Sequence, residues 1–198
     1  MLLLIAAVIG ISLLSRLPTS ASPREALIES IEQCHAAGGK NSCFREAAEN
    51  FLAKFSHEIL FRAIKDAEPE PLVFQYCHQI LHFAGRTVYD ETEDVGLSLG
   101  SGSPLCFAGF YHGVLEGYLH DHPDENVDAI TPGICRKNYF GVPQNYNECL
   151  HGLGHALMVF WDGEVPQALG SCDQLANDAD RNWCYSGVFM ENSTSATN

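Results

Sequence analysis

Three segments of the sequence each carry two potential metal ligands at a spacing of four residues. The pairs are His78 with His82, His112 with Glu116, and His151 with His155. Side chains four residues apart lie on the same face of an α-helix, one turn from each other. If the three faces turn toward a shared interior, five imidazoles and one carboxylate meet there. This donor set predicts a centre for copper, iron or zinc, with enough ligands for one ion or for two.

Three further side chains lie at the edge of this predicted centre. Met190 and Glu191 occur near the end of the chain and can complete the ligand set, and a methionine thioether would favour copper. Arg86 follows His82 by four residues and shares its helical face. A buried arginine there would bind an anionic substrate or pair with Glu116, and a simple salt bridge is our expectation.

A short motif recurs around these histidines. CFAGFYH at 106–112, CLHGLGH at 149–155 and CYSGVFM at 184–190 all fit CxxGxx(H/M), and CHQILHF at 77–83 is a degenerate copy without the glycine. A glycine inside a helix costs about 0.5–1 kcal/mol relative to alanine, so its recurrence needs compensation from close helix packing or close ligand approach. The motif predicts helical repeats whose cysteines form disulfides and whose histidines face a common interior.

A second hypothesis gives the same histidines a structural role. The protein is then a disulfide-rich helical-repeat scaffold, with core imidazoles that make hydrogen bonds and an acidic surface that binds a protein or peptide partner. A proton-linked switch is a variant of this interpretation. Haem held by paired histidines is a third hypothesis, although no CxxCH attachment motif occurs. An open coordination position would add hydrolytic or redox chemistry to the metal hypothesis.

Charge and motif content argue against several other classes. The net charge of −14 would repel nucleic acid and anionic lipid head groups. The segment HGLGH at 151–155 has the two-histidine spacing of the zincin motif HExxH but lacks its glutamate, which removes the general base of that mechanism. The sequence contains no CxxC pair and no Walker-type phosphate loop.

The first residues predict export from the cytoplasm. Residues 2–14 form an apolar run too short for a comfortable membrane span, and small residues up to Ala21 supply a cleavage site. We therefore expect a signal peptide over residues 1–21, with an uncleaved membrane anchor as the alternative. One secreted or periplasmic domain would then span residues 22–198.

Helix signals dominate the rest of the chain. Ser22, Pro23 and Glu25 form a capping box, and further helices are expected to begin near residues 42, 56, 71, 104, 147, 166 and 180. The acidic segment 90–103, rich in Gly and Ser, predicts a loop, and so does the segment that contains Pro123 and Pro132. No sustained alternation of polar and apolar residues indicates a strand.

The eight cysteines fit a set of stapled helix hairpins. A cysteine near the end of one helix can pair with a cysteine at the start of the next, and an oxidising compartment favours such pairing. The predicted pairs are Cys34–Cys43, Cys135–Cys149 and Cys172–Cys184, which leaves Cys77 and Cys106 for each other. The predicted class is an all-α fold of disulfide-stapled helix hairpins, arranged as a helical repeat, a bundle or a partial toroid.

Overall fold

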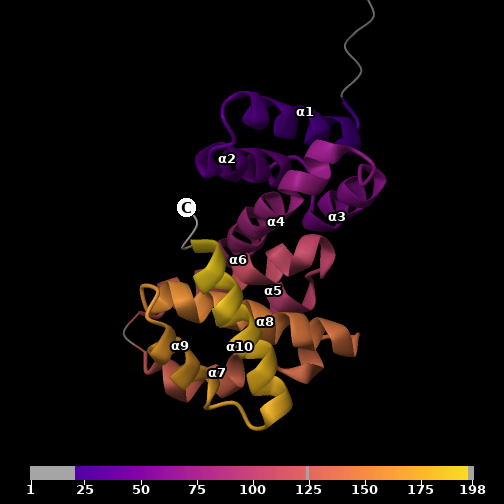
Figure 1. The fold of residues 1–198 in the computed structure, drawn as a ribbon. Coiled ribbons are helices and arrows are strands. Elements are labelled where there is room, and N and C mark those ends of the chain that lie inside the picture. Colours follow the sequence, from indigo (N-terminus) through magenta and orange to yellow (C-terminus); the bar gives the residue numbers. More distant parts are fainter. Residues whose placement is uncertain (1–20, 124, 196–198) are drawn as a thin grey trace, which may run out of the picture.

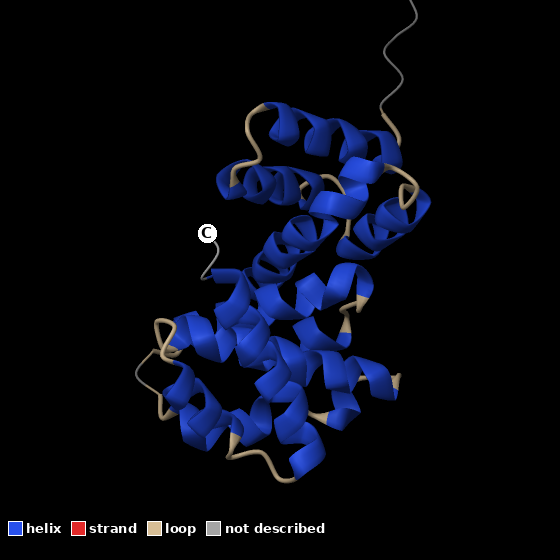
Figure 2. Ribbon diagram, in the orientation of Figure 1, coloured by secondary structure: helices blue, strands red, loops and turns tan. Residues whose placement is uncertain are grey.

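The computed structural model describes residues 21–123 and 125–195, and within these ranges it is built from helices. Ten α-helices and one short 3-10 helix follow one another, with no strand in the described ranges (Figure 2). The all-α prediction is confirmed. No helix in the described part of the chain is long and apolar enough to cross a membrane. Residues 1–20 of the predicted signal peptide lie outside the described ranges.

Three helices gather at one end of the molecule, namely α1 (Pro23–Ala36), α2 (Asn41–Leu52) and α3 (His57–Asp66) (Figure 1). The capping box at the start of α1 forms as predicted: the Ser22 hydroxyl accepts from the Glu25 N–H, and the Glu25 carboxylate accepts from the Ser22 N–H. Fully buried Leu27, Ile31 and Phe44 anchor α1 and α2 in the core.

The 22-residue helix α4 (Pro71–Thr92) runs from this end into the second half of the molecule, where α6 (Leu105–Asp121) packs along it (Figure 1). Helix α5 (Val95–Gly100) lies between them in the chain. Our prediction of a loop over 90–103 was wrong, because the Asp94 carboxylate accepts from the Leu97 N–H at 2.9 Å and starts a helix there. Fully buried Leu99 then holds α5 against the core, a tertiary contact that the composition of the segment conceals.

The second half continues with α7 (Val127–Ile134), the 3-10 helix η1 (Lys137–Tyr139), α8 (Pro143–Phe160), α9 (Val165–Cys172) and α10 (Asp178–Ser195). Part of the expected proline loop is thus helical, with Pro132 inside α7 and the Asn126 side chain capping it. Helix α8 begins before Asn147, because Pro143 fits the first turn of a helix.

All four predicted disulfides are present. They join Cys34 to Cys43, Cys77 to Cys106, Cys135 to Cys149, and Cys172 to Cys184. All eight cysteines lie in the described ranges, and no free thiol remains among them. Four disulfides in a domain of this size are typical of a protein that folds in an oxidising compartment.

Glycines let the central helices approach backbone to backbone. A Cβ atom on Gly113 of α6 would lie 1.8 Å from the carbonyl oxygen of His82 on α4. In the same way, a Cβ on Gly187 of α10 would lie 1.9 Å from the carbonyl oxygen of His151 on α8. No side chain fits at such distances, so the packing role is the one that compensates the cost of glycine in these helices.

The first turn of α6 departs from the helix that we predicted from residue 104 onward. Cys106, Phe107 and Ala108 all adopt left-handed backbone, with φ of 52°, 56° and 59°. This conformation costs a non-glycine residue roughly 1–2 kcal/mol. The Cys77–Cys106 disulfide and a 2.9 Å hydrogen bond from His78 Nδ1 to the Cys106 carbonyl hold the turn in place. The regular part of α6 therefore begins after Ala108.

Candidate metal centre

Helices α4, α6, α8 and α10 bring the predicted histidines together in the middle of the molecule. His112 on α6 occupies the centre of the group. Its ring stacks on that of His155 at a centroid distance of 4.3 Å and lies 5.8 Å from the ring of His151. The rings of His151 and His155 are 4.8 Å apart. Gly152 makes room for this arrangement, because a Cβ there would lie 2.9 Å from Cδ2 of His112.

His112, His151 and His155 form a group that can hold a metal ion. One ring nitrogen from each lies within 4.8 Å of the other two. His151 Nε2 and His155 Nε2 are 3.1 Å apart. Two ligands of a tetrahedral ion with Zn–N bonds of about 2.0–2.1 Å would be separated by about 3.3 Å. The two nitrogens of α8 are therefore already close to the spacing that a shared ion requires.

The partners of the opposite ring nitrogens decide where the protons lie. His155 Nδ1 is 2.8 Å from Glu191 Oε2, and His151 Nδ1 is 2.8 Å from Ser186 Oγ. An ionised carboxylate only accepts, and the Ser186 hydroxyl already donates to the Trp183 carbonyl at 2.6 Å. Both histidines consequently carry their proton on Nδ1. Their Nε2 atoms face each other at hydrogen-bond distance, but in the neutral rings neither has a proton to donate.

His112 supplies the third nitrogen from a buried position. His112 is only 3% exposed, and its buried Nε2 atom has no hydrogen-bond partner in the described part of the chain. Buried polar atoms in folded proteins are nearly always satisfied, and leaving one unpaired costs about 1–3 kcal/mol. A cation bound at this nitrogen would remove that cost.

The electrostatics of the centre favour neutral imidazoles. Burial, followed by the neighbouring His155, holds the pKa of His112 well below its usual value. The same two causes lower the pKa of His151 to about 4. Burial also lowers the pKa of His78. Unprotonated imidazole is the form that binds a metal, so these three residues need not lose a proton near neutral pH.

The other three members of the predicted ligand set belong to α4 and α6. The ring of His78 is 5.1 Å and that of His82 is 6.4 Å from the His112 ring. His82 Nε2 lies 3.0 Å from Glu116 Oε1, and the two side chains are about a quarter exposed. The structure thus places these residues next to the three-histidine group, and their role as ligands remains a prediction.

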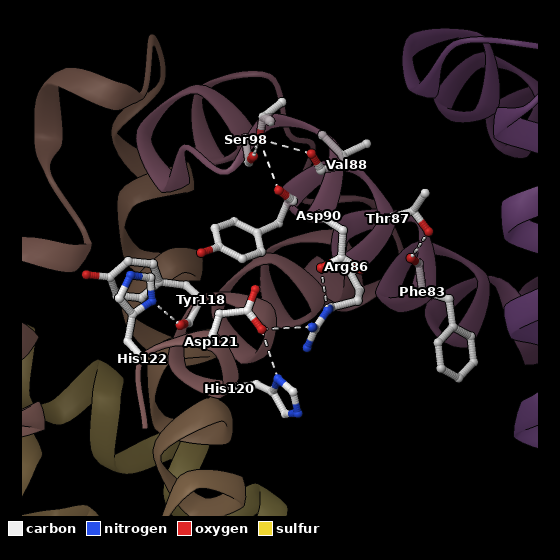
Figure 3. Close-up of polar contacts among 12 residues, drawn as sticks. Phe83, Arg86, Thr87, Val88, Asp90, Ser98, Tyr118, His120, Asp121 and His122 are labelled. Carbon is white, nitrogen blue, oxygen red and sulfur yellow. Dashed lines mark hydrogen bonds and ion pairs between the residues drawn. The ribbon is translucent and has the colours of Figure 1, made fainter. Parts of the chain in front are cut away.

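The three residues predicted at the edge of the centre have different surroundings. Glu191 contacts the centre through its bond to His155, whereas Met190 on the same helix is half exposed. Arg86 forms the simple salt bridges that we expected, with Asp90 at 2.7 Å and Asp121 at 3.2 Å (Figure 3). Glu116 pairs with His82 and not with Arg86.

Two polar residues of this region were not among the predicted site residues. Ser186 orients His151, and its only sequence signal is its place inside the CYSG segment of the recurring motif. Glu148 lies one turn before His151 on α8, and burial raises the pKa of its carboxyl group. Neither position is exceptional in sequence, because serine and glutamate are common on helix surfaces.

One further sequence match is ruled out by the structure. The segment GLSLG at 96–100 has the GxSxG spacing of a nucleophile elbow. Ser98 is fully buried within α5, and its hydroxyl lies 2.7 Å from that of Thr92. A nucleophile elbow exposes its serine at a turn between a strand and a helix, so Ser98 has a structural role.

Comparisons of the chain with protein-family models, with curated proteins and with solved structures gave no significant match. The functional interpretation below is drawn from the geometry of the centre.

Proposed function

We propose that the protein binds a transition-metal ion between His112, His151 and His155. The observation that carries this proposal is the pair of Nε2 atoms of His151 and His155, 3.1 Å apart, beside the buried Nε2 of His112, which has no hydrogen-bond partner among the described residues. One ring nitrogen from each histidine lies within 4.8 Å of the other two. A positive ion at this point stabilises all three.

The donors point to zinc, copper or iron. Imidazole suits these metals, whereas calcium and magnesium prefer oxygen ligands. All eight cysteines are held in disulfides, so thiolate is not available to the ion. Glu191 behind His155 and Ser186 behind His151 orient the rings in the way that second-sphere partners orient metal-bound histidines.

Three protein ligands leave a coordination position open. Catalytic zinc sites follow this pattern, with water or substrate in the fourth place, whereas structural zinc sites are closed by four protein ligands. We therefore propose a metal centre that admits an exogenous ligand, in a protein that is exported through its N-terminal segment. Hydrolytic and redox chemistry are the two reaction classes open to such a centre.

The test is the metal content of the disulfide-bonded protein. The chain is produced in an oxidising compartment without a metal-affinity tag, and bound metals are measured by elemental mass spectrometry. Wild-type protein and the control His120→Ala should contain stoichiometric metal, because the His120 side chain is 75% exposed and is not among the predicted ligands. The double variant His151→Ala/His155→Ala should lose the ion bound between His112, His151 and His155, and so contain at least one metal ion fewer per chain than wild type.

The competing hypotheses predict other results. A scaffold with structural histidines would contain no metal and would take up none, and the same double variant would lose stability alone. Bound haem would be recognised by its Soret absorption. Folded wild-type protein that neither contains nor takes up a transition metal would refute the proposed function.

A further inference from the structure

The helix pair α4 and α6 matches the pair α8 and α10 in several contacts. In each pair the first helix carries two histidines four residues apart, and the second carries a disulfide-bonded cysteine followed three residues later by glycine. That glycine touches the carbonyl of the first histidine in both cases. The Cβ position of Gly109 is 2.6 Å from the His78 oxygen, and that of Gly187 is 1.9 Å from the His151 oxygen.

In both pairs the second histidine contacts a glutamate on the second helix, although through different ring nitrogens. His82 Nε2 lies 3.0 Å from Glu116 Oε1, whereas His155 Nδ1 lies 2.8 Å from Glu191 Oε2. The first histidine of each pair directs Nδ1 to an oxygen on the second helix, at the disulfide-bonded cysteine or two residues after it. For His78 this oxygen is the Cys106 carbonyl, at 2.9 Å, so Nδ1 donates and Nε2 keeps the lone pair.

The charged side chains near the α4 histidines do not oppose the binding of a cation. Arg86 is the basic side chain closest in sequence to this histidine pair, one turn beyond His82. Its guanidinium group passes over Gly117, where a Cβ would lie 3.0 Å from Arg86 Cδ, and ends between Asp90 and Asp121 (Figure 3). The carboxylates of Asp90 and Asp121 therefore neutralise the Arg86 guanidinium group. The charged group in contact with His82 is the Glu116 carboxylate.

We propose that His78, His82 and Glu116 bind a second divalent transition-metal ion beside the one at His112, His151 and His155. The inference rests on the proposed function and extends it to a two-metal centre, with His112 between the two ions. The ion takes the place of the proton between His82 Nε2 and Glu116 Oε1, and the neutral His82 ring carries its one proton on Nδ1 instead. A separation of 3.0 Å between these atoms is close to the roughly 3.3 Å between two ligands of one tetrahedral ion.

The α4 histidines have to move slightly to share an ion. Their ring centroids are 6.2 Å apart, against 4.8 Å for the α8 pair. Two imidazoles bound to one tetrahedral ion have centroids about 5 Å apart. Binding of the second ion therefore draws His78 and His82 together by roughly 1 Å, which makes this position the later one to fill. Two metal ions in one centre can share a bridging ligand, such as a hydroxide or a carboxylate.

The number of ions bound by each variant tests the second position. Metal-free, disulfide-bonded protein is titrated with zinc chloride in metal-free buffer, and bound zinc is counted by elemental mass spectrometry after gel filtration. We expect two ions per chain in wild type and in His120→Ala. The conservative double variant His82→Asn/Glu116→Gln should bind one ion, and His151→Ala/His155→Ala should also retain only one. Near-ultraviolet circular dichroism and the absence of free thiols show that each variant is folded.

The outcomes separate the second ion from the first. One ion in wild type that persists in His82→Asn/Glu116→Gln and disappears in His151→Ala/His155→Ala overturns the second position and leaves the proposed function standing. Two ions that both persist in His82→Asn/Glu116→Gln place the second ion elsewhere and also overturn the inference. No zinc in folded wild-type protein overturns both the inference and the proposed function.

Discussion

The contact between Gly187 of α10 and the backbone of α8 gives the sharpest stability prediction. In Gly187→Ala the new Cβ would lie 1.9 Å from the His151 carbonyl oxygen and 3.1 Å from Gly154 Cα. Both obstacles belong to the facing backbone, so no side-chain rotation relieves the clash. The two helices have to separate by about 1 Å before the contact becomes tolerable. The separation also pulls Ser186 and Glu191 away from the histidines that they orient.

The expected loss follows from two opposing terms. Overpacking a core costs about 1–3 kcal/mol, and alanine regains about 0.5–1 kcal/mol over glycine inside a helix. Because the clash is with backbone, we expect the upper end of the cost and a net loss of about 2 kcal/mol. For a domain of this size that lowers Tm by about 4–8 °C. Affinity for zinc should fall as well, because Ser186 and Glu191 no longer fix the imidazoles.

The matched control is Gly170→Ala in α9. A Cβ at Gly170 meets no atom within 4 Å, so this change keeps only the helix-propensity gain of about 0.5–1 kcal/mol and should raise Tm slightly. Both variants are compared with wild type by thermal unfolding, followed by circular dichroism, with the disulfides intact. If Gly187→Ala unfolds at the same temperature as Gly170→Ala, the close packing of α8 and α10 described above is wrong.

Three further predictions concern the centre and its supports. In metal-free protein the pKa of His151 is about 4 when folded and about 6.5 when unfolded, so the contribution of His151 to the free energy of unfolding is fully present above pH 6.5 and is lost as the pH falls toward 4. Urea unfolding should show a loss on the order of 1–3 kcal/mol over this range, and a smaller loss in His151→Asn. The same pH dependence in both proteins would contradict the lowered pKa of His151. Glu191→Gln should weaken zinc binding 10–100-fold in a chelator competition titration, since the carboxylate no longer fixes the proton of His155, and an unchanged Kd would rule out this orienting role. Replacing both Cys77 and Cys106 by serine should lower the free energy of unfolding by about 3–4 kcal/mol, as expected for a link across 29 residues, and an unchanged urea midpoint would speak against that contribution.

The sequence was informative where local rules dominate. The capping box at Ser22 and Glu25 formed as predicted, because the two residues satisfy each other without help from the rest of the chain. Three of the disulfides followed from the order of helix ends, since a hairpin brings such ends together, and Cys77–Cys106 followed because only these two cysteines were left. The spacing of His151 and His155 placed them on one face of α8, where their rings meet.

The errors arose where tertiary contacts decide the local structure. Helix α5 exists because Leu99 is buried against the core, although Gly96, Gly100 and the neighbouring serines argue for a loop. The left-handed turn at 106–108 is held by a disulfide and a histidine bond across 28 or 29 residues of chain, which no local rule includes. The sequence also did not show which of the six predicted ligands would lie close enough to share one ion. Periodicity put six donors on inward faces, but only the packing of α6 against α8 shows which three share one position.

The position of the bound ion tests the central claim most directly. Crystals of the disulfide-bonded protein, grown with zinc, would be measured on both sides of the zinc absorption edge, so that anomalous scattering locates the metal. We predict an anomalous peak within about 2.0–2.2 Å of one nitrogen each from His112, His151 and His155. A centre without anomalous signal, or zinc confined to exposed histidines such as His120, would contradict the account.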